Sequence, residues 1–188
     1  ANLRRDQITQ AMRTLVNEIE VDCGKTAYLA SRATGTAGTT PFASGLGDTA
    51  QVRKILSDNG APLSDLQCVI DTTAGANLRS NAQLTKANEA GTTALRAQGT
   101  LLELHGFVLR ESAGVARHTA GTGARYVTNG ALAIGATVIP VQTGSGTIIA
   151  GDVVTIGNYK YVVTSALSGG NVTIGAPGLR EAVAGGST

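Results

Sequence analysis

The residues best placed for chemistry lie in one stretch, from Ser64 to Ser80, which reads SDLQCVIDTTAGANLRS. A short apolar run, LQCVI, stops at Asp71 and gives way to small and polar residues. This order predicts a strand, a tight turn and the start of a helix, which is how nucleotide-binding and nucleophile-bearing folds present their functional groups. The first question is therefore whether Asp71 belongs to an active site.

Each candidate for catalysis has a simpler structural interpretation. Cys68 falls within the apolar run, which favours a buried structural thiol over a reactive one, and no G-x-S-x-G elbow offers a serine nucleophile. His105 lies at a strand break and His118 in a loose connector, so packed or solvated histidines are favoured over a general base. Asp71 precedes Thr-Thr and a helix, the setting of an N-cap. We therefore predict no catalytic residues and no enzyme.

Nucleotide and metal sites are also disfavoured. Residues 45–50, GLGDTA, fit the letters G-x-G-x-x-A, but the TTPFAS ahead of them is not a buried strand and no βαβ unit surrounds them. The sole Gly-Lys pair, Gly24-Lys25, falls inside a helical pattern without P-loop spacing. Two histidines without clustered carboxylates, and two distant cysteines, make no metal site. We expect neither a cofactor nor a metal.

Composition narrows the class of protein further. The chain has 188 residues, of which 42% are hydrophobic and only 3% aromatic, so its core must be built from Val, Ile, Leu and Ala. A net charge of +2 is too small to argue for nucleic acid as the main partner. No run approaches the about 18 apolar residues of a membrane span, and the start lacks the apolar core of a signal peptide. We expect a soluble chain made in a reducing cytoplasm.

The first 33 residues predict one long helix, because apolar residues recur at spacings of three and four from Ile8 to Ala27. The charges on its polar face are sorted along the chain. Basic residues come first and acidic ones follow, which is the reverse of what the helix dipole prefers. Two interpretations stay open: a solvated face, or a contact between subunits made by Arg4, Arg5, Arg13, Glu18, Glu20 and Asp22.

The pattern up to residue 111 is that of an α+β unit. A Gly/Thr/Ser loop spans 34–47, and a capping-box-like pair, Asp48 and Gln51, predicts a second helix that ends at Asn59-Gly60. LQCVI is expected to be a buried central strand, followed by a short helix. Residues 84–98 are expected to be a weak helix or loop, and 100–111 a strand pair or one strand bent at a glycine.

The composition changes near Ser112, and beyond a loose connector the helical periodicity disappears. The short runs ATVIPV, GTIIAGDVVTI, YKYVVTS and NVTIG are typical of strands, and GSG, GN and SGGN are typical of hairpin links. So many short strands suggest a small closed barrel or a sandwich, because both limit exposed sheet edges. We therefore place an α+β core at 1–128 and a small β-barrel at 129–188.

Taken together, these features resemble the major capsid protein of tailed double-stranded DNA bacteriophages, the Johnson fold, in the branch with an inserted β-barrel. LRRDQITQAMRTLVNEIEVDCGKTAYLAS looks like the family's spine helix. LSDNGAPLSDLQCVIDTTAGANLRSN is similar to a helix, core strand and short helix of its axial domain. GTLLELHGFVLRES resembles the turn back toward the insertion, and IIAGDVVTIGNYKYVVTS the strands of the inserted barrel. The resemblance covers essentially the whole chain.

The resemblance implies a coat subunit that self-assembles into an icosahedral head. Its partners would be copies of itself in hexamers and pentamers, scaffolding and portal proteins, and packaged DNA bound nonspecifically, with no membrane. It would be made in the bacterial cytoplasm and reside in the virion. The family's N-terminal arm and final strands have no counterpart here, which predicts a fragment, encoded by a prophage. The alternative is another virion component, such as a tail or decoration protein; a hydrolase or nucleotide-dependent enzyme remains the least favoured class.

Overall fold

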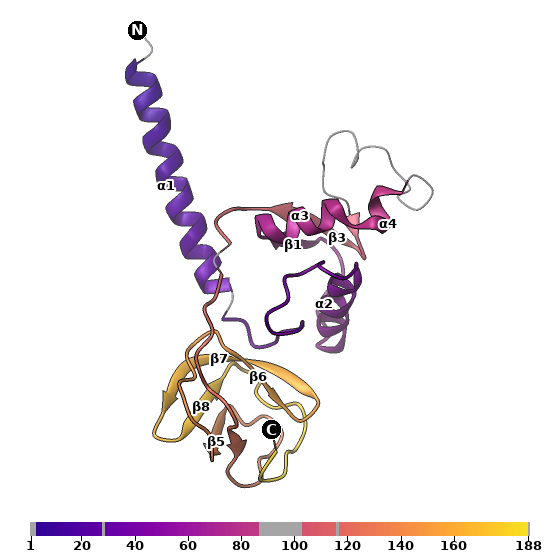
Figure 1. The fold of residues 1–188 in the computed structure, drawn as a ribbon, viewed down its shortest axis with the longest axis vertical. Helices are drawn as coiled ribbons and strands as arrows, with labels where there is room; N and C mark the ends of the chain where they lie inside the picture. Colours follow the sequence, from indigo (N-terminus) through magenta and orange to yellow (C-terminus); the bar gives the residue numbers. More distant parts are fainter. Residues whose placement is uncertain (1–2, 28, 87–102, 116, 188) are drawn as a thin grey trace. The chain divides into compact units, whose positions relative to one another are not determined.

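The computed structural model describes residues 3–27, 29–86, 103–115 and 117–187. The chain divides into two compact units, shown in Figure 1. Unit 1 consists of residues 1–24 and 34–116, and unit 2 of residues 25–33 and 117–188. The sequence boundary was expected after residue 128, whereas the contacts divide the chain between 116 and 117 and assign 25–33 to the β-rich unit.

The long N-terminal helix, α1, spans Leu3–Ala27 and so ends before residue 33. At about 1.5 Å per residue, such a helix is about 37 Å long. Although its charges are sorted against the dipole overall, Asp6 in the first turn and Lys25 in the last turn oppose that trend. The predicted helix is therefore confirmed, with an end six residues earlier than expected.

Helix α2, Gly47–Asp58, begins and ends with different devices. Its end is a Schellman motif: the Ala61 and Gly60 N–H groups donate to the carbonyls of Leu56 and Ser57, and Gly60 has φ +71°. The predicted capping box at its start is wrong. The N-cap has no side-chain hydrogen bond, and the Asp48 carboxylate instead accepts from the Phe42 N–H at 2.6 Å, which holds the preceding loop.

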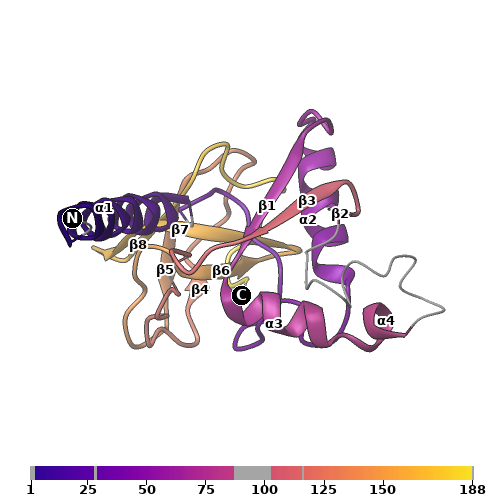
Figure 2. The same cartoon turned by 90° about the horizontal axis from the view of Figure 1, so that it is seen from above.

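Among its described residues, unit 1 has a sheet of three strands in the order β1-β3-β2, and Figure 2 shows β1 beside β3. Strand β1 spans Leu66–Ile70, β2 Glu103–Leu104 and β3 Phe107–Glu111. β1 runs parallel to β3, with Cys68 opposite Leu109. The expectation of a buried central strand is wrong, because β1 is an edge strand whose side chains alternate and whose Val69 is 54% exposed.

Helices α3, Thr72–Ser80, and α4, Ala82–Thr85, follow β1 directly. The predicted cap is confirmed, since an Asp71 carboxylate oxygen accepts from the Ala74 N–H at 2.9 Å. Leu78 of α3 is fully buried in a small core to which the loop, β1 and β3 also contribute. That core consists of Phe42, Ile70, Ala74, Leu78, Leu84 and Leu109.

We expect Asp71→Ala to lower the free energy of unfolding of unit 1 by about 1 kcal/mol, the usual cost of a lost N-cap. Asp71→Asn should cost only a few tenths of that, because the amide oxygen accepts the same hydrogen bond. Urea unfolding followed by far-ultraviolet circular dichroism measures the difference. Equal losses in both variants would show that Asp71 acts through its charge and not as a cap.

The hairpin β2–β3 turns at His105 and Gly106, which have φ of 51° and 83°. Two central residues with positive φ are the signature of a type I′ turn. The strand pair expected over 100–111 is thus confirmed from residue 103 onward. Residues 100–102, and most of the weak helix or loop expected over 84–98, lie outside the described residues.

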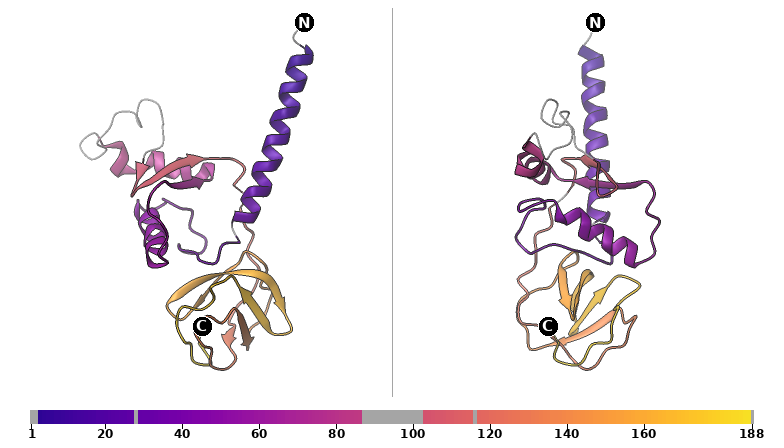
Figure 3. Two further views of the ribbon diagram at one scale, coloured as in Figure 1. Left: turned by 180° about the vertical axis from the view of Figure 1, so that it is seen from behind. Right: turned by 90° about the vertical axis from the view of Figure 1, so that its right-hand side faces the viewer.

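Unit 2 is built on one five-stranded antiparallel sheet with the order β4-β5-β8-β7-β6, whose curvature Figure 3 shows. The Gly157-Asn158 turn links β6 to β7 and Gly169-Gly170 links β7 to β8, as the sequence predicts. The bounds of the strands are Val127–Thr128 for β4, Val138–Gln142 for β5, Val153–Ile156 for β6, Tyr159–Ser168 for β7 and Asn171–Ile174 for β8.

The expected closed barrel is a half-barrel among the described residues, because β4 and β6 are the two ends of the strand order. β4 has only two residues, and in the described strand order it does not pair with β6, so the sheet does not close into a barrel. The GSG segment, Gly144–Gly146, is not a turn between neighbouring strands, since β5 and β6 are not adjacent. The chain is thus α+β, with a curved open sheet in its second half.

Ser31 and Arg32 pair with strand β7 of this sheet. The Val162 N–H donates to the Ser31 carbonyl at 3.4 Å, and Arg32 forms an isolated antiparallel bridge with Tyr161. The Arg32 guanidinium stacks over the rings of Tyr159 and Tyr161, at 5.0 and 5.2 Å from their centroids. Its Nε and Nη1 are buried without a hydrogen bond, so the two aromatic faces stabilise the cation.

Candidate interaction surface

The apolar side of α1 is exposed along most of its length. Five of its large apolar side chains, all between residues 8 and 19, are between 49% and 65% accessible, whereas those of the two cores are nearly inaccessible. These five are Ile8, Met12, Leu15, Val16 and Ile19. Single exposed apolar residues need no explanation, but a continuous stripe of this kind is typical of a surface that binds another protein. We call these five residues the α1 stripe.

The six charged residues expected to contact another subunit all lie on α1 and are all exposed. The structure brings them together on one helix beside the α1 stripe. Glu20 also accepts a hydrogen bond from the Ser112 hydroxyl at 3.1 Å, which ties α1 to the strand-end segment of unit 1. It stays a prediction that these six residues contact another copy of the chain; they are Arg4, Arg5, Arg13, Glu18, Glu20 and Asp22.

The residues first considered for catalysis have structural contacts in different parts of the fold. Asp71 caps α3, and Cys68 packs beside the core of unit 1, where burial raises the pKa of its thiol. His105 is exposed in the β2–β3 turn, with its Nδ1 2.8 Å from the Thr49 hydroxyl. His118 belongs to unit 2, where its Nε2 is 2.7 Å from Asp152. These residues form no common site.

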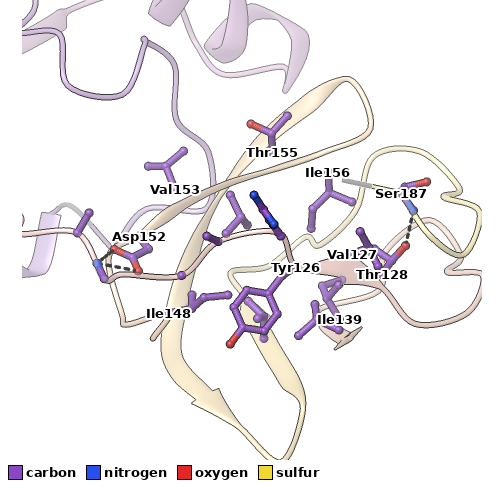
Figure 4. A pocket seen from close by; sticks show the side chains of 18 residues that line it. Tyr126, Val127, Thr128, Ile139, Ile148, Asp152, Val153, Thr155, Ile156 and Ser187 are labelled. Atoms are coloured by element: carbon purple, nitrogen blue, oxygen red, sulfur yellow. Dashed lines mark hydrogen bonds between the residues drawn. The ribbon is translucent and has the colours of Figure 1, made fainter. Parts of the chain in front are cut away.

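Unit 2 has a groove of about 530 Å³ between the β6 edge and the segment that leads into β4, drawn in Figure 4. Its floor is apolar and includes Ile139, Ile148 and Ile156, which also belong to the core of the sheet. Tyr126 lies at its rim, where its hydroxyl donates to the Gly146 carbonyl at 2.8 Å. The groove follows directly from the open sheet, and sequence reasoning missed it by expecting a closed barrel.

Asp152 is the one buried carboxylate of the described groove lining. It accepts hydrogen bonds from the Gly121 N–H at 3.0 Å and the Ile149 N–H at 2.8 Å, and pairs with His118. Burial by itself raises the pKa of this carboxyl, but the hydrogen bonds from Ile149, His118 and Gly121 outweigh it and leave the pKa below its ordinary value. Because all its oxygens are engaged, Asp152 acts as a brace between two loops.

No cluster of three or more His, Cys, Asp or Glu side chains with metal-site geometry occurs in the part of the chain that the structure describes. The helices within that part are each too short or too polar to cross a bilayer. The fold and its surfaces therefore define a two-unit α+β protein whose most distinctive surface is the α1 stripe with its sorted charges.

Comparison with known proteins adds no family to this description. The chain matches no family model, and no curated protein is similar to it.

Proposed function

We propose that this chain is a structural subunit that assembles with copies of itself into the head of a tailed double-stranded DNA bacteriophage, as a major capsid protein. The observation that supports this most directly is the α1 stripe, since an exposed apolar surface flanked by charge suits repeated contacts between subunits. A shell tolerates contacts that are individually weak, because many of them form at once. The sequence resemblance supplies the particular kind of assembly.

The finer parts of the proposal follow the same resemblance. Unit 1 would correspond to the spine helix and axial domain, and unit 2 to the inserted β-domain. The partners would be further copies in hexamers and pentamers, scaffolding and portal proteins, and DNA without sequence preference. The location would be the virion.

The test is negative-stain electron microscopy of sedimented material after expression of the complete open reading frame that encodes these 188 residues. We expect closed shells or tubes with a wall of uniform thickness. Monomers or small rings as the sole product would contradict the capsid proposal and favour a tail or decoration protein, for which the groove of unit 2 would be the surface of interest.

A further inference from the structure

The spacing within the α1 stripe is that of a two-helix seam. Ile8, Met12, Leu15 and Ile19 follow one another at intervals of four, three and four residues, the alternation of the a and d positions of a heptad. Val16 widens the seam on one side. This spacing keeps the apolar residues facing a second helix over about three turns, which a merely solvated helix does not require.

The charges beside the seam determine which orientation of a second copy fits. Residues 3–13 have a net charge of +2, from three arginines and Asp6, and residues 14–27 have −2, from three acidic residues and Lys25. A parallel pair of α1 helices would place like charges side by side at both ends. An antiparallel pair places the basic half of each helix against the acidic half of the other.

We propose that α1 binds α1 of a second copy in antiparallel orientation, about a twofold axis between Met12 and Leu15. Met12 then faces Leu15 of the second copy, and Ile8 faces Ile19. In this register Arg4 and Arg5 lie opposite the turn that contains Asp22. The inference rests on the proposed self-assembly and specifies one of its contacts.

Charge variants of the full chain test the pairing by sedimentation equilibrium at low salt, where exposed charges are least screened. Arg4→Glu with Arg5→Glu makes both ends repulsive and should weaken dimerisation by about tenfold or more. Adding Glu18→Lys and Asp22→Lys to the same chain exchanges the signs and should restore the wild-type constant within about threefold. Failure of this exchange to restore association would overturn the antiparallel pairing.

A matched pair of aspartate substitutions tests the seam. Met12→Asp puts a charge in the centre of the apolar contact and should weaken dimerisation by about a hundredfold. Gln10→Asp, two residues earlier and therefore on the opposite side of the helix, should leave it within about twofold. Equal effects, or a wild-type chain that stays monomeric throughout, would overturn the inference.

Disulfide mapping reads the orientation directly. Ile8→Cys and Ile19→Cys are combined with Cys23→Ser and Cys68→Ser, and the oxidised dimer is digested with trypsin, which releases peptides 6–13 and 14–25. In an antiparallel pair, the disulfide joins peptide 6–13 of one chain to peptide 14–25 of the other. In a parallel pair, it joins each peptide to the same peptide of the second chain. The second result overturns the inference. Shells formed by Met12→Asp would also overturn it and would leave the capsid proposal standing.

Discussion

Replacing Asp152 by alanine is expected to lower the free energy of unfolding of unit 2 by about 3 kcal/mol, because buried donors lose a charged acceptor. The Gly121 and Ile149 N–H groups and the His118 ring all point at this carboxylate. Asp152→Asn should lower the free energy of unfolding by about half as much. The amide oxygen of asparagine still accepts a hydrogen bond, but its NH₂ group faces another donor. Denaturant unfolding of both variants measures the two losses.

The natural tyrosines of the chain provide a fluorescence signal for this unfolding experiment. The chain has no tryptophan, and its four tyrosines all fall within the residue ranges of unit 2. Tyrosine fluorescence therefore reports the unfolding of unit 2 alone. Asp6→Ala, which removes an exposed carboxylate from α1, is the control and should leave the transition unchanged. A stability of Asp152→Ala equal to that of the wild type would contradict the role of Asp152 as a brace.

The same carboxylate predicts how unit 2 responds to acid. Its pKa in the folded state lies below the ordinary value of 3.8, so its ionised form stabilises the fold at any pH above that value. The contribution is lost as the pH falls from 3.8 through the lowered folded pKa. We expect the wild type to lose stability in this range more steeply than Asp152→Asn, measured by acid titration of tyrosine fluorescence. Parallel curves would exclude Asp152 as the cause.

The second large effect is expected at Tyr161, where alanine should cost unit 2 about 4 kcal/mol through the cavity that it leaves. Its side chain is fully buried in the core of the sheet, its hydroxyl accepts from the Arg180 N–H at 3.0 Å, and its ring supports Arg32. Tyr161→Phe keeps the ring and should cost only about 1 kcal/mol, for the lost hydrogen bond.

Urea unfolding followed by circular dichroism in the far ultraviolet measures these losses, since both variants also remove a tyrosine signal. Tyr159→Ala is the matched control, because this ring lies in the same strand, also stacks against Arg32, but is only partly buried. It should lose clearly less than Tyr161→Ala. The reverse order would mean that the stack on Arg32, and not the core of the sheet, determines the stability of unit 2.

The local elements of the fold could be predicted from the sequence because their signals lie within a few residues of one another. The α1 periodicity, the Asn59-Gly60 helix end and the Asp71 cap are all of this kind, and each was confirmed. Even here a local signal failed at Asp48, whose carboxylate bonds an N–H six residues upstream and leaves the helix start uncapped.

What the sequence could not predict depends on pairs that are distant along the chain. β1 pairs in parallel with β3, which lies about forty residues later in the chain. A five-residue apolar run does not indicate which strand it will pair with, or whether it will lie at the centre or the edge of a sheet. His118 and Asp152 meet across 34 positions, and neither has a distinctive local pattern. The sheet is open because β4 pairs through only two residues. The alternation of polar and apolar residues in the sequence does not determine how many residues of a strand pair.

The assignment of residues 25–33 to unit 2 has a consequence for the order of events during translation. Ser31 and Val162, whose N–H donates to the Ser31 carbonyl, are 131 positions apart in the sequence. Ser31 therefore leaves the ribosome long before Val162 is synthesised. Contacts of such long range form slowly, and N-terminal domains usually fold first. Residues 34–116 emerge in the interval, so unit 1 has its entire sequence before β7 exists. The sheet of unit 2 is thus completed only after β7 and β8 have been made, when the sequence of unit 1 is already available for folding.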